Sequence, residues 1–172
     1  MDEPTLRVGL LLGAERAQID LEGDFDVEVA GQAESLGRRR GEVVARAENG
    51  AIVLPGLEPA ESLKLVPRDT ENCSFLLHDM IVGVSFHWEH TEDLRFRGAV
   101  HLVCRGNTLD VVNEVPLEEY LVSVISSEMS PECPEASLRA HAVISRSWLI
   151  AQILAEKGTR PAGDGFDKPV RD

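Results

Sequence analysis

One carboxylate closes an apolar helical stripe in the C-terminal third of the sequence, in surroundings that suit acid–base chemistry. The stripe has helical spacing and ends on Glu128, and its apolar members are Leu117, Leu121, Val124 and Ile125. We expect a carboxyl group at the end of such a face to be partly desolvated, which raises its pKa. A general acid that works near neutral pH needs a raised pKa. A carboxylate that only caps the helix or forms an ion pair gives the same pattern.

Two arginines follow on one face of a second predicted helix. Arg139 and Arg146 are seven residues apart with small residues between them, and positions at this spacing are neighbours along a helix. They can cradle an anionic group or hold a carboxylate. Alternatively, Arg139 pairs with Glu135 on a solvated face. Trp148, close by, is expected to pack in the core.

Two helices must position these residues. Pro116 suits the first position of a helix because its missing N–H costs nothing there, and acidic residues fill the turn that follows. Pro134 is expected to open a second helix that runs to about Lys157, where Gly158 can end it. Residues 159–172 have no periodicity, which indicates a loop.

Short β-rich runs separated by turn residues occupy the chain before residue 112, which predicts an antiparallel β region. The runs cover residues 6–12, 18–21, 26–30, 42–47, 52–54, 63–66, 81–88, 99–105 and 107–112. Asn49-Gly50 and Gly106-Asn107 are the best hairpin turns. The predicted fold class is therefore α+β, with a β-rich antiparallel N-terminal part followed by two helices.

The acidic composition of the chain limits which binding partners are expected. The 172 residues include 17 Lys and Arg against 30 Asp and Glu, a formal net charge of −13. A nucleic-acid backbone or an anionic membrane surface would require a basic face, and the single basic run, Arg38-Arg39-Arg40, is too short to supply one. No apolar stretch reaches the roughly 20 residues of a transmembrane helix. The length corresponds to about one domain.

The three cysteines, Cys73, Cys104 and Cys133, are an odd number without short spacing. One disulfide with one free thiol and three reduced thiols both fit this count. A zinc ribbon would need two C-x-x-C pairs, and the sequence contains none. We expect no metal and no cofactor.

Two further chemistries are weaker alternatives. On a strand, His87 and Glu89 share a face while His90 points away, so these residues are not expected to close a metal site. Cys133 lies near a helix N-terminus, where a thiol pKa falls, and Ser127 lies in the preceding helix. No base at a supporting spacing accompanies either nucleophile.

A longer motif resembles the stage II sporulation protein D family (SpoIID/LytB domain). It begins with Asn113-Glu-Val-Pro-Leu-Glu-Glu-Tyr-Leu121, continues through Val124 to Glu128-Met129, and ends with Glu135-Ala-Ser-Leu-Arg-Ala-His-Ala-Val-Ile-Ser-Arg-Ser-Trp148. The likeness covers about residues 97–154, and the upstream Phe96-Arg-Gly98 also resembles the family.

The resemblance implies a division into a β-rich part (1–95), a motif region (96–158) and a loop (159–172). In the family the domain continues beyond the long helix, with further strands and often metal-binding Cys and His residues. The 172 residues are therefore expected to be the front part of a longer domain, lacking part of the substrate groove and inactive alone.

Enzymes of this family are lytic transglycosylases that cut peptidoglycan glycan strands stripped of stem peptides. The likeness assigns the catalytic acid to Glu128 and a second catalytic residue, the family's following arginine, to Arg146. We expect the two helices to present Glu128 and Arg146 toward each other. Arg139 takes the place of a lysine and His141 that of a glutamine, both as substrate-binding residues. His141 and Trp148 depart from the common pattern.

Related modules implied by the same resemblance bind glycan or enhance a cell-wall amidase without cutting, which is the alternative function. The substrate implies export to the periplasm or cell envelope. The start, Met1-Asp-Glu-Pro4, lacks the basic and apolar regions of a secretory signal, so a signal is expected to have been trimmed from this chain.

Overall fold

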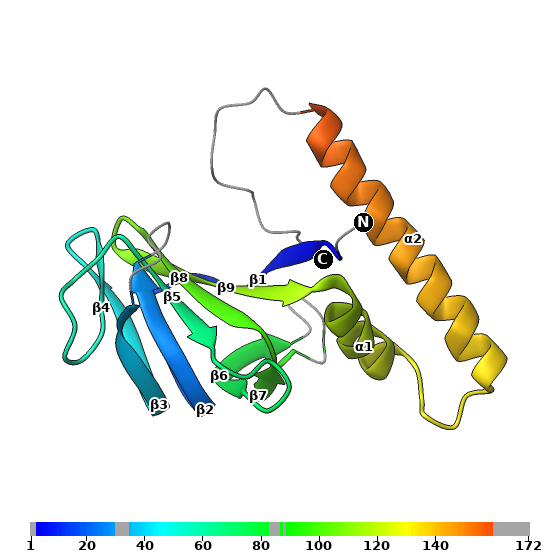
Figure 1. Ribbon diagram of the computed structural model, residues 1–172, viewed down its shortest axis with the longest axis horizontal. Helices are drawn as coiled ribbons and strands as arrows, with labels where there is room; N and C mark the ends of the chain where they lie inside the picture. The colour runs from blue at the N-terminus through cyan, green and yellow to red at the C-terminus, as the bar shows by residue number, and fades with distance from the viewer. Residues whose placement is uncertain (1–2, 30–34, 83–86, 88, 160–172) are drawn as a thin grey trace. The chain divides into compact units, whose positions relative to one another are not determined.

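The computed structural model describes residues 3–29, 35–82, 87 and 89–159. Within them the chain forms two compact units, a sheet unit of residues 7–115 and a helical unit built from residues 3–6 and 116–159 (Figure 1). The antiparallel sheet followed by two helices confirms the predicted α+β class. The division at residues 95 and 158 stays a prediction.

The described residues form a sheet of nine strands. They are β1 (Thr5–Ala14), β2 (Arg16–Val29), β3 (Ser35–Glu48), β4 (Ala51–Val53), β5 (Ser62–Pro67), β6 (Ser74–Val82), β7 (His90–Phe96), β8 (Ala99–Arg105) and β9 (Thr108–Pro116). Their order is β1-β9-β8-β5-β2-β3-β4, with β6 beside β2 and β7 beside β6. The pairs among β2 to β9 are antiparallel.

Alternating burial along the strands builds one core. In β5, Leu63 and Leu65 are fully buried while Lys64 between them is only partly covered, as expected of a strand with one buried face. In β2, the run predicted at 18–21 and the described part of the run predicted at 26–30 form one strand. Gly23, at φ +103°, allows the register shift between Leu21 and Phe25 instead of ending the strand.

Both predicted hairpin turns are confirmed. Asn49 and Gly50 join β3 to β4, and their φ angles of 51° and 81° are the left-handed pair that a two-residue turn requires. Gly106 and Asn107 join β8 to β9, which leaves Arg105 paired with Thr108.

The β6–β7 region differs from the prediction. Of the run expected at 81–88, residues 81 and 82 are the end of a strand that begins at Ser74, and residues 83–86 and 88 lie outside the described part. Strand β7 was not predicted. It is charged and mostly exposed because, among the described strands, it pairs only with β6, and charged residues are typical of such an edge.

A close backbone approach joins β9 to the β7–β8 connection. Asn113 is buried, and its Nδ2 donates to the carbonyl oxygens of Arg97 (2.8 Å) and Ala99 (3.1 Å). Between those two residues, Gly98 has φ +91°, and a Cβ there would collide with the carbonyl oxygen of Glu114. These contacts give a physical reason for the glycine and the asparagine that the sequence motif contains.

A cluster of three ionisable groups crosses β5, β8 and β9. Glu114 Oε2 lies 2.9 Å from His101 Nε2, and Glu114 Oε1 accepts from Lys64 Nζ at 2.7 Å. His101 is buried and the Glu114 side chain is 26% exposed. The His101 hydrogen bond, followed by Lys64, lowers the pKa of Glu114 to about 2.

We expect this cluster to make folding stability sensitive to acid. Because the pKa of Glu114 in the folded protein, about 2, lies below its ordinary value of 4.5, the stabilisation is complete above pH 4.5 and is lost as pH falls toward 2. The shift corresponds to roughly 3 kcal/mol. Denaturant unfolding between pH 5.5 and 2.5 should show a flatter pH dependence for Glu114→Gln. The exposed control Glu48→Gln should retain the dependence of the parent, and equal slopes in all three proteins would contradict the assignment.

The helices are α1 (Leu117–Glu128) and α2 (Glu135–Thr159). Pro116 is not the first helical residue: its ψ of 146° is extended, and it caps the helix as the last residue of β9. The first N–H groups of α1 are satisfied by the N-terminal segment, since Leu117 N donates to Pro4 O and Glu118 N to Glu3 Oε1.

Helix α2 begins after Pro134, as predicted, but Gly158 does not end it. Glycine permits the left-handed conformation that closes many helices without enforcing it. The loop predicted for residues 159–172 lies outside the described residues except for Thr159, the last residue of α2. Neither helix is long and apolar enough over its described residues to cross a membrane.

Candidate functional site

Glu128 is the last residue of α1, and its carboxylate faces α2. Oε2 lies 2.7 Å from Nε2 of His141, and the Glu128 side chain is 56% exposed. The predicted desolvation is therefore wrong. The buried part of the stripe consists of Leu117 and Leu121, and burial falls off along the helix, so that the carboxylate is open to solvent.

His141 is more deeply placed than its partner. Its side chain is 24% exposed, and Nδ1 is buried without a hydrogen-bond partner among the described residues. It lies on the inner face of α2, at helical spacing from Leu138 and the buried Leu149. A partly buried imidazole thus presents one nitrogen to an exposed carboxylate and fixes its orientation.

Arg146 holds a different carboxylate. Its Nε and Nη2 donate to Oε1 and Oε2 of Glu118 at 2.7 and 2.5 Å, which lowers the pKa of Glu118. The prediction that the helices present Glu128 and Arg146 toward each other is wrong. The helices run antiparallel, so residues farther along α2 meet earlier residues of α1, and Glu118 lies ten residues, or about 15 Å, before Glu128.

The other two residues singled out on α2 face solvent. Arg139 donates to Glu135 Oε1 through Nε (3.1 Å) and Nη2 (2.7 Å), and both side chains are almost fully exposed. The structure therefore agrees with the alternative in which Arg139 pairs with Glu135 on a solvated face. Trp148 is 54% exposed, so its predicted core position is wrong. Its neighbour Leu149, one step around the helix, takes the inner position instead.

The pairs Glu128–His141 and Glu118–Arg146 were not predicted from the sequence. A usable signal was the short connection of residues 129–134, which forces two successive helices to run antiparallel. Counting outward from that connection pairs the end of α1 with the beginning of α2. The partner of Glu118 then falls in the middle of α2.

The weaker alternatives gain no support. No three His, Cys, Asp or Glu side chains converge as metal ligands in the part of the chain that the structure describes. His90 lies 3.4 Å from Glu92, and Trp88 of the same segment lies outside that part. All three thiols are free, with Cys73 buried and Cys104 and Cys133 half-buried.

The sequence matches known proteins over this region. Residues 105–169, which include α1 and all of the described chain after it, match the family model SpoIID, described as stage II sporulation protein. The chain is also 36% identical over 116 residues to the stage II sporulation protein D of Bacillus amyloliquefaciens, over 67% of this chain and 28% of that protein. The chain belongs to the stage II sporulation protein D family. Membership indicates a role connected with the cell wall.

Two further relatives extend the likeness of this SpoIID family chain. An uncharacterized protein of Chlamydia muridarum is 27% identical over 157 residues, covering 90% of this chain and 50% of that protein. An uncharacterized protein of Brachyspira hyodysenteriae is 32% identical over 68 residues, covering 40% of this chain and 18% of that protein. The chain spans half or less of the length of these curated relatives. No solved structure matches it.

Proposed function

We propose that the full-length protein is a lytic transglycosylase that cuts denuded peptidoglycan glycan strands, with Glu128 as its general acid and base. The observation that carries this proposal is the exposed Glu128 carboxylate held 2.7 Å from the partly buried His141, inside the region that matches the SpoIID family. A polymeric substrate needs an accessible acid, and an acid needs a fixed orientation. The pair supplies both.

A single carboxylate suffices for this reaction. Once a bound glycan strand covers the exposed Glu128 and excludes water from it, protonated Glu128 donates its proton to the glycosidic oxygen as the bond from that oxygen to the anomeric carbon breaks. The C6 hydroxyl of the muramoyl residue then attacks the anomeric carbon, and the Glu128 carboxylate accepts the hydroxyl proton. The products are a 1,6-anhydromuramoyl end and a free hydroxyl on the leaving sugar, and no water is consumed. Glycosidases that add water generally need a second carboxylate.

His141 acts in this proposal by positioning Glu128. Its Nε2 engages Oε2, which leaves Oε1 for the glycosidic oxygen. The assignment of His141 and Arg139 to substrate binding stays a prediction, as does a catalytic part for Arg146. Because Arg146 is held by Glu118, its contribution in this arrangement is to fasten α2 to α1.

The proposed substrate also sets the location and the partners. Peptidoglycan lies outside the cytoplasmic membrane, so the working protein is exported to the periplasm or cell envelope. Glycan strands stripped of their stem peptides are the product of a cell-wall amidase, and such an enzyme is the partner that this substrate implies.

The proposal is tested by incubating the full-length protein with denuded and with intact peptidoglycan and analysing the soluble products by mass spectrometry. We expect sugars ending in 1,6-anhydromuramic acid from the denuded strands and few from intact material. Reducing ends in place of anhydro ends would indicate a hydrolase and overturn the mechanism. Glycan binding without any product, or stimulation of an amidase alone, would favour the non-catalytic module.

A further inference from the structure

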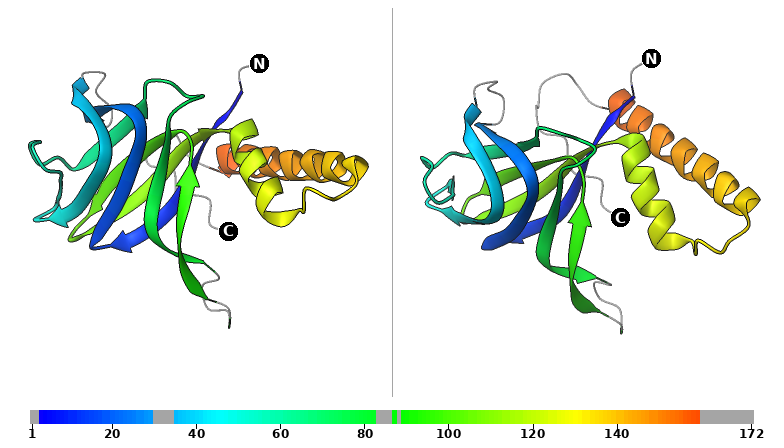
Figure 2. Two further views of the ribbon diagram at one scale, coloured as in Figure 1. Left: turned by 90° about the horizontal axis from the view of Figure 1, so that it is seen from below. Right: turned by 60° about the horizontal axis from the view of Figure 1, so that its bottom comes forward.

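Strands β6 and β7 run beyond β2 as a two-stranded ribbon (Figure 2). The pairing of β6 with β2 ends at Ile19–Leu77, whereas β6 and β7 pair again from Met80–Glu92 to Val82–His90. Between these parts the register shifts, and Asp79 has φ +57°. His78 therefore lies at the base of the ribbon, where it leaves the sheet.

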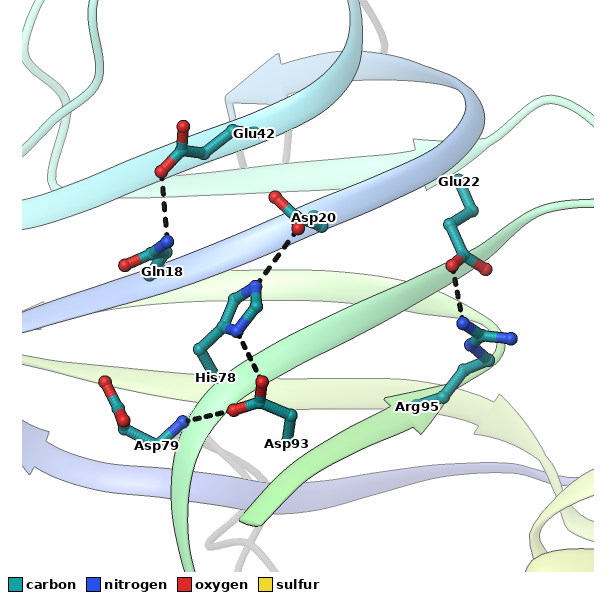
Figure 3. A network of polar contacts seen from close by, with 8 residues as sticks. All are labelled: Gln18, Asp20, Glu22, Glu42, His78, Asp79, Asp93 and Arg95. Carbon is teal, nitrogen blue, oxygen red and sulfur yellow. Dashed lines mark hydrogen bonds and ion pairs between the residues drawn. The ribbon is translucent and has the colours of Figure 1, made fainter. Parts of the chain in front are cut away.

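His78 lies between two carboxylates (Figure 3). Its Nδ1 is 2.9 Å from Asp93 Oδ2 on β7, and its Nε2 is 3.1 Å from Asp20 Oδ2 on β2. Ionised carboxylates only accept hydrogen bonds, so both contacts exist together only when both ring nitrogens carry a proton. The geometry thus selects the imidazolium form. Asp20 first, and Asp93 as well, raise the pKa of His78 above its ordinary 6.5.

The two carboxylates that contact His78 differ in whether a second hydrogen bond holds them in place. Asp93 Oδ1 also accepts from the backbone N–H of Asp79 at 3.1 Å, so this carboxylate is fixed within the ribbon whatever the charge on the ring. The Asp20 side chain makes no other hydrogen bond or ion pair among the described residues. A neutral imidazole keeps one N–H. That proton stays on the Asp93 side, and the contact with Asp20 is the one that is lost.

The surrounding charges are already engaged. On the same face, Arg95 of β7 donates to Glu22 of β2 at 2.7 Å, and Ser74 of β6 donates to the other oxygen of Glu22. Glu42 of β3 accepts from Gln18 of β2 at 3.0 Å. Asp79 is the further charged residue beside His78 on β6 itself. No cation in this network is therefore free to replace the imidazolium at Asp20.

We propose that Asp20, His78 and Asp93 form a pH-operated latch that fastens the base of the β6–β7 ribbon to β2 when His78 is protonated and releases Asp20 when it is not. The direction follows from the raised pKa of His78. The latch is closed below pH 6.5 and opens as pH rises through the higher pKa of the folded protein. The consequence is local, since the pairing of β2 with β6 at residues 74–77 does not depend on His78.

Amide hydrogen exchange between pH 6 and 9, corrected for the intrinsic pH dependence of exchange, tests the latch on the wild-type protein. We expect the protection of the β6 amides from Met80 to Val82 to fall roughly two- to fivefold as pH rises, the range expected for one exposed ion pair. The β3–β4 hairpin around Asn49-Gly50, which contains no histidine, should not respond and serves as the internal reference. Wild-type protection that is independent of pH would overturn the proposal.

Two variants separate the latch from general charge effects. Asp20→Asn removes the partner that only the imidazolium can hold, so the pH response of the ribbon should disappear and the pKa of His78, measured by NMR, should fall. Glu22→Gln is the matched control on the same face of β2, and it should leave both the response and that pKa unchanged. If Asp20→Asn responds as the wild type does, or Glu22→Gln loses the response, the latch is refuted.

Discussion

Glu128→Gln is expected to lower the rate at which the full-length protein releases anhydromuramoyl products by at least about a hundredfold, the usual contribution of a positioned general acid. Glutamine keeps the shape of the side chain and its reach toward His141, but it cannot donate and recover a proton. Because the parent side chain is exposed at the end of α1, the change should leave the melting temperature nearly unaltered. Product release is followed by chromatography and mass spectrometry on denuded strands.

A matched control lies four residues away. Glu132, in the connection between the helices, is exposed, and Glu132→Gln removes the same charge without touching the proposed acid. It should retain full activity. His141→Ala should lower kcat more than it raises KM, because it frees the carboxylate without removing it, and His141→Gln should restore part of the loss. Unchanged product release by Glu128→Gln would end the catalytic assignment, whatever the binding of glycan.

Gly98→Ala is expected to be the most destabilising single methyl addition in the sheet unit, at roughly 3 kcal/mol or more. Two costs combine at this position. The backbone at φ +91° is unfavourable for any residue with a Cβ, and the new methyl group would collide with the carbonyl oxygen of Glu114. Relief by movement would break the contacts of Asn113 with Arg97 and Ala99. Denaturant unfolding followed by circular dichroism measures the change.

Gly106→Ala separates the two costs. Gly106 also has positive φ, at +69°, but no atom lies within 4 Å of the position that a Cβ would take. It should therefore lose only the conformational contribution, about 1 kcal/mol. If the two alanine variants lose equal stability, the close approach of β9 to the β7–β8 connection contributes nothing.

The strands were largely predictable wherever the sequence has the residue types that are typical of strands and of the turns between them. Both two-residue turns carry a glycine, and buried and less buried positions alternate through β4 and the first four residues of β9, which follow these turns. Strand β7 was not predicted because an edge strand can be stable with few apolar residues. Its sequence then lacks the alternation of apolar and polar residues that identifies a strand. At Gly23 the error was the opposite one, because a strand end was predicted where the strand continues. A glycine that permits a bulge resembles a strand end in sequence.

The helices were predicted to within a residue or two, but their mutual register was not. The helical spacing of apolar residues locates the apolar face of each helix. It does not decide which of two adjacent apolar residues faces inward, as Trp148 and Leu149 show. The partners of Glu128 and Arg146 depend on how far the two helices slide past each other, which the connection and the inner side chains decide together. Because the motif was interpreted as one continuous sequence, residues that lie far apart on the two helices were predicted to act together.

The attachment of residues 3 and 4 to the first turn of α1 has a consequence for the order in which the protein folds. Leu117 and Glu118 depend on acceptors more than 110 positions earlier in the chain, and β1, which follows those acceptors, pairs with β9, which precedes the helix. During synthesis, residues 3 and 4 must wait until slightly more than two thirds of this sequence has emerged before they find their partners in α1. Closing so long a loop is entropically slow, so we expect the start of α1 to be among the last parts of the helical unit to become ordered.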